Sequence, residues 1–139
     1  MEIDLTDYKP SENEPYMNPK QLAYFKKKLL VWKQELLDES LETINHLKEY
    51  SSNEPDISDR ATAEVDTAFE LRTRDRYKKL IDKIDSALDR IENGSFGYCL
   101  ETGEPIGIKR LEARPVATLT VEAQERRENY ERQHNEEDE

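Results

Sequence analysis

Cysteine and histidine are scarce in this sequence of 139 residues, which has one cysteine and two histidines. One cysteine cannot form an internal disulfide, and a structural zinc ion needs about four nitrogen or sulfur ligands. His46 falls within a long helical pattern and His134 within a charged tail, so neither has the neighbours of a catalytic group. We therefore expect no metal site and no enzyme.

Long apolar runs and an excess of basic charge are also absent. No run of about 18 apolar residues occurs, so no membrane-spanning helix is expected. The N-terminal stretch MEIDLTDYKP lacks the basic and apolar sections of a signal peptide, which makes the cytoplasm the expected compartment. The 32 acidic and 21 basic residues give a formal charge of −11. Because phosphate neutralisation supplies most nucleic-acid affinity, we expect no direct sequence-specific binding to DNA.

Hydrophobic residues make up only 35% of the chain and charged residues 38%, so an extended shape is more consistent with the composition than one round core.

A first long helix is predicted to start at Asn18-Pro19, with asparagine as the cap and proline at the first helical position. Spacings of three and four typical of a coiled-coil seam connect Leu22, Phe25, Leu29, Trp32 and Leu36. The stripe is widened or continued by Leu30, Leu37, Leu41, Ile44 and Leu47, and the helix is expected to end near Tyr50.

A second long helix is predicted after the breaker-rich stretch SSNEPDISD, in which Asp56 or Ser58 can be the cap. Asn93-Gly94 ends this helix, because glycine readily adopts the left-handed conformation found beyond helix ends. Two long helices joined by a short turn must pack antiparallel to bury their seams. The apolar positions of the second helix are Val65 and Phe69, then a heptad series of Tyr77, Leu80, Ile84, Ala87 and Ile91.

The stretch FGYCLETGEPIG begins like half of a zinc finger. Cys99 opens a Cys-x-x-Cys pattern, but Thr102 stands where the second cysteine is expected. We favour a buried, apolar role for Cys99. A redox-sensing thiol is the alternative, although the chain has no second cysteine to resolve it.

The expected fold class is mainly α, with a long antiparallel two-helix coiled-coil hairpin and a small loop-rich C-terminal unit. Three of the four glycines fall within 96–124, and a polar helix that frays near His134 is expected from Val121. The unit is therefore interpreted as a degenerate zinc finger ending in a helix. The expected divisions are an N-terminal extension at 1–17, the hairpin at 18–93 with its tip at 51–59, and the C-terminal unit at 94–139.

Two groups of charged residues each have a structural and a functional interpretation. Asp56 and Asp59, with Ala61 just after them, can cap the second helix or can be carboxylates presented at the end of a long hairpin. The basic cluster can pair with nearby acids or can dock onto an acidic surface or a phosphorylated ligand. Its members are Arg72, Arg74, Arg76, Lys78, Lys79 and Lys83, and Arg110 and Arg114 follow in the loop-rich unit.

From EPYMNPKQLAYF to about Gln124 the chain resembles the DksA family of bacterial RNA polymerase-binding transcription factors, in the zinc-less form of alphaproteobacteria. The motifs DISDRA, ELRTRDR and GYCLETGEPIGIKRLEARP carry the resemblance and are specific in combination. The resemblance implies that the hairpin enters the secondary channel of RNA polymerase. It further implies a role in the stringent response, in which guanosine tetraphosphate and the factor together modulate ribosomal RNA and amino-acid biosynthesis promoters.

The resemblance also assigns roles to individual residues. The tip that approaches the polymerase active centre would be formed by Asp56, Asp59 and Ala61, and further polymerase contacts by Thr73 and Arg76. Gln124 departs from the family, because zinc-bearing relatives have a lysine there and an amide cannot pair with phosphate as a cation does. The positions that bind guanosine tetraphosphate, the alarmone of the stringent response, would be Leu80, Lys83, Arg110 and Arg114.

The resemblance implies a loop fold without zinc and without another bound cofactor. The family's four ligand positions read Cys99, Thr102, Thr120 and Ala123 in this sequence. Packing must then hold the loops, and each buried apolar side chain contributes about 1.5–3 kcal/mol. The apolar residues available for this are Phe96, Tyr98, Ile106, Ile108, Leu111 and Leu119.

Two other functions stay open beside a polymerase-binding regulator. One is a Gre-like transcript-cleavage factor, in which acidic tip residues would hold a catalytic metal ion. The other is a structural coiled-coil adaptor. We expect a monomer whose partners are RNA polymerase and guanosine tetraphosphate, with no membrane association.

Overall fold

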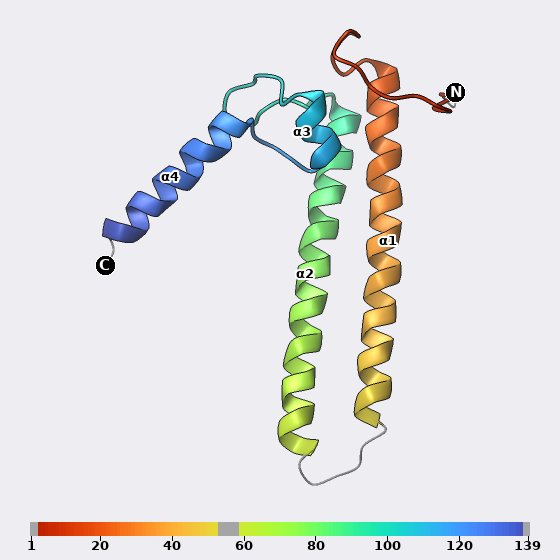
Figure 1. Ribbon diagram of the computed structural model, residues 1–139, viewed down its shortest axis with the longest axis vertical. Helices are drawn as coiled ribbons and strands as arrows, with labels where there is room; N and C mark the ends of the chain where they lie inside the picture. The colour runs from red at the N-terminus through yellow and green to blue at the C-terminus, as the bar shows by residue number, and fades with distance from the viewer. Residues whose placement is uncertain (1–2, 53–58, 138–139) are drawn as a thin grey trace. The chain divides into compact units, whose positions relative to one another are not determined.

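Four helices account for most of the chain in the computed structural model, which describes residues 3–52 and 59–137 and the side chains of 3–46, 48–49 and 64–135. They are α1 (Pro19–Ser52), α2 (Asp59–Asn93), α3 (Ile108–Ala113) and α4 (Val121–Glu137). The helices α1 and α2 run side by side in opposite directions (Figure 1), which confirms the predicted hairpin. None of the described helices is long and apolar enough to cross a membrane.

The start of α1 follows the expected capping pattern. The Asn18 side-chain oxygen accepts a hydrogen bond from the Gln21 N–H at 2.9 Å, and the Asn18 carbonyl accepts one from the Leu22 N–H at 3.0 Å. These bonds satisfy two of the N–H groups that lack a partner inside the helix. The helix continues to Ser52, two residues beyond the predicted end at Tyr50.

The end of α2 lies at the predicted Asn93-Gly94 junction. Gly94 has a φ of 84°, in the left-handed region that glycine adopts without steric cost. The N–H groups of Ser95 and Phe96 both donate to the Arg90 carbonyl, at 3.0 and 3.1 Å, and so satisfy the last turn. The caps expected at Asp56 and Ser58 lie outside the described residues.

The chain divides into two compact units that share the two long helices. The first unit comprises Met1–Lys28 and Ala87–Glu139, and the second comprises Leu29–Ser86. Each long helix therefore contributes one part to each unit.

The second unit has a narrow core along the predicted seam. Leu29 and Leu36 of α1 and Ile84 of α2 are buried, and the Lys33 ammonium donates to Asp85 Oδ1 at 2.7 Å across the two helices. Thr73 joins this core with only 6% of its surface exposed. Among the described side chains of 37–46 and 64–72, none is buried, so the core thins toward the ends of the helices at Ser52 and Asp59.

The wide apolar stripe predicted for α1 is wrong in part. Two helices bury only the narrow seam at which they meet, and residues beside that seam need a third element to cover them. The same holds for α2, where Val65 and Phe69, expected to be apolar contacts, are 63% and 50% exposed. The other exposed apolar residues of this unit are Leu30, Val31, Leu37, Leu41 and Leu71.

The first unit is built around two aromatic rings. Phe25 of α1 and Phe96 of the loop after α2 are both buried, with ring centroids 5.7 Å apart. The residues expected to hold the loops supply most of the surrounding packing, while Tyr98 is only half-buried. The remaining core residues of this unit are Met17, Ala87, Cys99, Ile106, Ile108, Leu111, Val116, Ala117, Leu119 and Ala123.

The segment before α1 is irregular, as predicted, but it is also packed against the rest of the first unit. Tyr16 is half-buried and its ring meets Tyr98 edge to face, with centroids 5.5 Å apart. Gln21 is fully buried and fixes the segment by accepting the Met17 N–H at 2.8 Å and donating to the Ser11 carbonyl at 3.2 Å. At the other end of the chain α4 continues past His134, where fraying was expected, to Glu137.

Candidate functional site

The loop that resembles a zinc knuckle is closed by backbone hydrogen bonds. The Cys99 N–H donates to the Glu104 carbonyl at 2.8 Å, and the Gly103 N–H returns to the Cys99 carbonyl at 2.9 Å. A third bond from the Ile106 N–H to the Gly97 carbonyl, at 2.8 Å, continues the pairing. Backbone hydrogen bonds therefore close the knuckle-like turn around its single cysteine.

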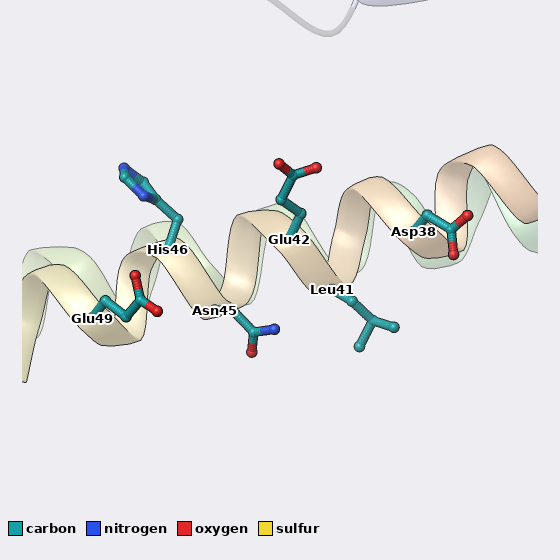
Figure 2. A pocket seen from close by; sticks show the side chains of 6 residues that line it. All are labelled: Asp38, Leu41, Glu42, Asn45, His46 and Glu49. Carbon is teal, nitrogen blue, oxygen red and sulfur yellow. The ribbon is translucent and has the colours of Figure 1, made fainter.

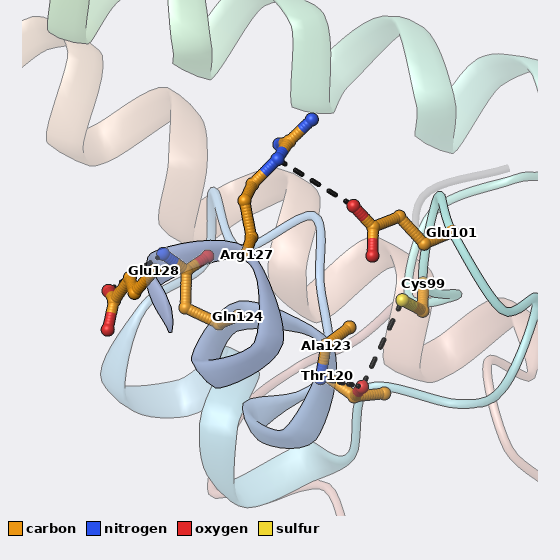
Figure 3. Close-up of polar contacts among 7 residues, drawn as sticks. All are labelled: Cys99, Glu101, Thr120, Ala123, Gln124, Arg127 and Glu128. Atoms are coloured by element: carbon orange, nitrogen blue, oxygen red, sulfur yellow. Dashed lines mark hydrogen bonds and ion pairs between the residues drawn. The ribbon is translucent and has the colours of Figure 1, made fainter. Parts of the chain in front are cut away.

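The four positions predicted to correspond to the family's zinc ligands are Cys99, Thr102, Thr120 and Ala123, and they differ in their surroundings. Thr120 is buried beside Cys99, and its hydroxyl lies 4.0 Å from the sulfur (Figure 3). The same hydroxyl accepts the Ala123 N–H at 3.2 Å and so caps α4. Thr102 is exposed and accepts the Glu104 N–H at 3.2 Å, while Ala123 has no donor atom in its side chain. Within the described part of the chain, no group of three or more His, Cys, Asp or Glu residues could hold a metal ion.

The Cys99 thiol is buried, with 3% of its surface exposed, as the favoured interpretation required. Burial raises the pKa of this thiol, but hydrogen bonds from the Thr102 hydroxyl and from the backbone N–H groups of Thr120, Thr102 and Glu101 outweigh the effect. The pKa of Cys99 is lowered to about 6 as a result. The knuckle thus favours a thiolate even though it lacks the other ligands.

The segment before α1 closes over this loop. The Tyr16 hydroxyl donates to the Gly97 carbonyl at 2.6 Å and accepts the Gly107 N–H at 3.0 Å, so one side chain joins both ends of the knuckle. Met17 packs so closely on Gly97 that a Cβ at Gly97 would lie 2.8 Å from Met17 Cγ and Sδ. Desolvation raises the pKa of Tyr16, so the hydroxyl stays protonated and able to donate.

Arg110 and Arg114 lie on α3 and at its C-terminal end, and they have different surroundings. Arg110 is half-buried, and its Nε donates to the Leu119 carbonyl at 2.8 Å. Arg114 is exposed, and its N–H donates to the Arg110 carbonyl at 2.7 Å. Of the two arginines expected to bind the alarmone, Arg114 is the one with an exposed side chain.

The other end of α3 is also fixed by α1. Lys28 donates to the Glu112 carbonyl at 2.9 Å and to Glu112 Oε2 at 2.7 Å. Burial raises the pKa of the Glu112 carboxyl, but hydrogen bonds from Lys28 and Tyr24 outweigh it and leave that pKa below its ordinary value. Tyr24 is affected in the opposite direction, because desolvation and the Glu112 carboxylate raise its pKa to about 12.

The predicted sites on α2 lie on one face of that helix, since Thr73, Arg76, Leu80 and Lys83 are separated by three or four residues. Thr73 is buried in the hairpin core and Leu80 is half-buried, whereas Arg76 and Lys83 are exposed. Leu80 and Lys83 belong to the second unit, and Arg110 and Arg114 to the first.

The basic cluster of α2 is largely unpaired. Arg74 forms a 2.7 Å ion pair with Glu70, the arrangement expected for an intrahelical pair. Within the described residues no salt bridge is formed by Arg72, Arg76, Lys79 or Lys83, all of which are exposed. These four, which we call the basic stripe, are spaced by three or four residues along α2.

The predicted tip is only partly described. Asp56 lies outside the described residues. Asp59 is the first residue of α2 and Ala61 lies in its first turn, and the structure describes only the backbone of both. Their assignment to a tip therefore stays a prediction.

A shallow groove of about 520 Å³ runs along α1 in the second unit. Figure 2 shows Glu42 and His46 pointing to one side of the helix and Leu41 and Asn45 to the other. Asp38 and Glu49 complete the lining. Its acidic lining gives the groove the wrong charge for a phosphorylated ligand.

Gln124 occupies the first turn of α4 and its amide donates to Glu128 Oε1 at 3.0 Å (Figure 3). The amide is therefore engaged with an acidic neighbour on its own helix. Arg127, one turn further on, forms a 3.7 Å ion pair with Glu101 of the knuckle loop.

Comparison with known proteins places these features in a family. The model of the N-terminal domain of DnaK suppressor protein DksA matches residues 21–91, and the model of the prokaryotic dksA/traR C4-type zinc finger matches residues 94–129. The RNA polymerase-binding transcription factor DksA of Caulobacter vibrioides (strain NA1000 / CB15N) is 62% identical over 132 residues, covering 95% of this chain and 93% of the relative. The chain belongs to the DksA family. The structure of this chain is also similar to the solved structure of transcription factor DksA2 from Pseudomonas aeruginosa. The TM-score is 0.76 and the identity 44%, and the match covers 84% of this chain and 90% of that one.

More distant DksA proteins match most of the chain as well. The RNA polymerase-binding transcription factor DksA of Escherichia coli (strain K12) is 45% identical over 115 residues, covering 83% of this chain and 76% of the relative. These relatives are named as transcription factors and not as enzymes, in agreement with the expectation for this chain. The C4 description of the matching zinc-finger model contrasts with the single cysteine of this chain.

Sequence reasoning missed three residues that organise the first unit. Tyr16, Gln21 and Lys28 each form hydrogen bonds to distant or irregular parts of the chain. None of them belongs to a motif with a recognised mechanism. A polar residue at an otherwise apolar position was the only signal available, and only Gln21, four residues before Phe25 on the same helix face, gave it.

Proposed function

We propose that this protein regulates transcription initiation by binding RNA polymerase, with its helical hairpin entering the secondary channel. The observation that carries the proposal is the 62% identity to a factor named for polymerase binding, because it extends over 95% of this chain. Both the hairpin and the C-terminal unit are included in that match. A protein that shared only a coiled coil with this factor would not match across both.

The exposed surface of the second unit supports contact with a partner. Val65, Phe69 and Leu71 of α2 keep half or more of their surface exposed, although apolar side chains of this size favour burial. The basic stripe lies on the same helix and adds unpaired cations to it. Arg76 would contact the polymerase directly, whereas the buried Thr73 would act by setting the packing of the hairpin.

The tip residues Asp56, Asp59 and Ala61 would approach the moving parts of the active centre. Asp59→Asn removes one negative charge and keeps the size of the side chain. We expect this variant to bind core polymerase as the wild type does and to lose its effect on a ribosomal RNA promoter. Equal loss of binding and of regulation would show that the tip has only a structural role.

We further propose that guanosine tetraphosphate acts with this factor and that Arg114 and Lys83 contribute to its binding. Both side chains are exposed cations with no ion pair among the described residues, which suits them to phosphate. Leu80 would pack beside the ligand. Arg110 would mainly support Arg114, since its Nε is already engaged with the Leu119 carbonyl.

The chain is also proposed to work without zinc. The positions that would supply ligands hold one thiol, two hydroxyls and a methyl group, and Thr120 already caps α4. Zinc in structural sites is held by four thiolate or imidazole ligands, which these residues cannot supply. Purified protein should contain clearly less than one equivalent of zinc, and a chelator should leave its melting temperature unchanged.

A pull-down with core polymerase, with and without guanosine tetraphosphate, tests the central proposal. The wild type should be retained at moderate salt, and Arg76→Ala should weaken retention. Arg126→Ala is the matched control, because it removes an arginine of α4 that is also exposed. Failure of the wild type to bind would favour a structural adaptor, and stimulated transcript cleavage on stalled complexes would favour a Gre-like factor.

A further inference from the structure

The helix α3 is fastened to α1 and its leading segment at both ends. At its start the Gly107 N–H donates to the Tyr16 hydroxyl at 3.0 Å, and the cap residue Gly107 has no side chain that could satisfy this end. At its end the Lys28 ammonium donates to the Glu112 carbonyl at 2.9 Å. Carbonyls in the last turn of a helix lack partners within it, so Lys28 supplies one of the bonds that a short helix cannot make for itself.

The Lys28 contact has two parts, which makes it directional. Besides the carbonyl bond, Lys28 donates to Glu112 Oε2 at 2.7 Å, and about one third of each side chain is exposed. Two acceptors on the same residue fix both the height and the rotation of the last turn of α3 relative to α1. Arg114 follows this turn immediately as the C-cap residue, with its N–H bonded to the Arg110 carbonyl at 2.7 Å.

Contacts along α3 itself also hold the helix in place. Ile108 and Leu111 are buried, and Arg110 Nε donates to the Leu119 carbonyl at 2.8 Å. A helix of six residues has little stability of its own, so its orientation depends on such contacts. The direction in which Arg114 projects is therefore set by residues that do not themselves face the ligand.

We propose that Lys28 and Tyr16 are positioning residues for the alarmone response, acting through α3 to place Arg114. This inference rests on the proposed role of Arg114 in binding guanosine tetraphosphate. Neither Lys28 nor the Tyr16 hydroxyl is proposed to contact the ligand. Their removal should weaken the response to the alarmone and leave the alarmone-independent binding of polymerase unchanged.

The test measures the alarmone concentration that gives half-maximal effect on a ribosomal RNA promoter, with factor at saturating concentration. Lys28→Met keeps the aliphatic stem and removes both hydrogen bonds. We expect a roughly fivefold increase in that concentration, because a partly exposed charge-assisted pair is worth about 1 kcal/mol and 1.4 kcal/mol corresponds to a factor of ten. The maximal effect at saturating alarmone and the affinity for core polymerase without alarmone should not change.

Matched variants separate positioning from general destabilisation. Lys26 lies on the same helix as Lys28 and forms an exposed ion pair with Glu92 of α2 at 3.1 Å. Lys26→Met removes that pair and should leave the half-maximal concentration unchanged. Glu112→Gln keeps the backbone carbonyl as an acceptor and should cause only about a twofold increase. Tyr16→Phe keeps the ring packing on Tyr98, loses the hydroxyl and should cause about a threefold increase.

A double variant decides whether Lys28 acts through Arg114. Arg114→Ala should raise the half-maximal concentration more than Lys28→Met does, and the combination should be no worse than Arg114→Ala alone. Additive effects, or an unchanged half-maximal concentration in Lys28→Met, would overturn the inference while the alarmone proposal stands. If Arg114→Ala itself has no effect, the proposed alarmone site is wrong and the inference falls with it. Melting temperatures, measured for all variants, verify that each is folded at the assay temperature.

Discussion

Thr102 and Thr120, two positions predicted to correspond to the family's zinc ligands, should respond differently to pH when their hydroxyl groups are removed. Thr120→Val keeps the shape of the side chain and removes the hydroxyl that accepts the Ala123 N–H at 3.2 Å. Loss of such a helix cap costs about 1 kcal/mol of stability. The cap itself does not involve a titrating group, so this part of the cost should be the same at about pH 5 and about pH 8. The same hydroxyl also donates to the Cys99 sulfur at 4.0 Å, so Thr120→Val should have a further, smaller cost at about pH 8, where the thiolate is populated.

Thr102→Val should instead have an effect that grows with pH. Burial raises the pKa of Cys99, but hydrogen bonds from the Thr102 hydroxyl and from nearby N–H groups lower it to about 6 in the folded protein. An unfolded cysteine has a pKa of about 8.5. Because the folded pKa is the lower one, the thiolate stabilises the fold, fully above the unfolded pKa and less and less as pH falls toward about 6.

Removing the Thr102 hydroxyl takes away one donor to that thiolate. We expect a cost of about 1 kcal/mol at about pH 8, the net value of one such bond, and a clearly smaller cost at about pH 5, where the thiol is protonated. Urea unfolding of the wild type and both variants at the two pH values measures this difference.

The same measurement in a Cys99→Ala background supplies the control. Thr102→Val should lose its pH dependence there, and Thr120→Val should keep the cost of the lost cap at both pH values. A cost of Thr102→Val that is equal at both pH values would refute the account of the knuckle as a thiolate-stabilising loop.

Three further predictions concern the first unit. Gly97→Ala should destabilise the protein by more than 1 kcal/mol in urea unfolding, because φ is 91° and the added Cβ would lie 2.8 Å from Met17. Gly103→Ala is the control: φ is 74° but the space around it is open, so this variant should cost only about 1 kcal/mol. Gln21→Leu should cost about 2–3 kcal/mol and expose the leading segment to limited proteolysis, since it leaves buried partners of the amide unsatisfied. The pKa of Glu112 lies below its ordinary value in the folded protein. Its ionised form therefore adds stability that is fully present above the unfolded pKa of about 4.3 and is lost as pH falls through the folded pKa. Glu112→Gln should remove this dependence, so that its free energy of unfolding falls less steeply with decreasing pH in that range than that of the wild type.

The hairpin could be predicted from the sequence because its signals are local. Asn18 and Gly94 act on the turn of helix next to them, and both do what their residue types favour. The apolar spacing identified Leu29, Leu36 and Ile84 as buried. It could not show how wide the buried stripe is, since that depends on how many helices meet, and this is why Leu30 and Leu37 beside the seam are exposed.

The closure of the knuckle could not be predicted because its partners are distant in sequence. Tyr16 bonds to the backbone of Gly97 and Gly107, which are 81 and 91 residues away. Hydrogen bonds from one hydroxyl to irregular backbone leave no periodic pattern in the sequence. The same reason applies to Lys28, whose partner Glu112 is 84 residues away.

These long-range bonds also change what kind of structure the knuckle is. A zinc ion stabilises a finger locally, because all of its ligands lie within the finger. Here the loop between Gly97 and Gly107 is held by Tyr16, and Met17 lies against Gly97, so the loop keeps its shape only while the segment before α1 is in place. Gln21 in turn ties that segment to the first turn of α1. The first unit should therefore unfold as one cooperative block, and an alteration in the leading segment should reach Arg114 at the end of α3 without any change in the knuckle sequence.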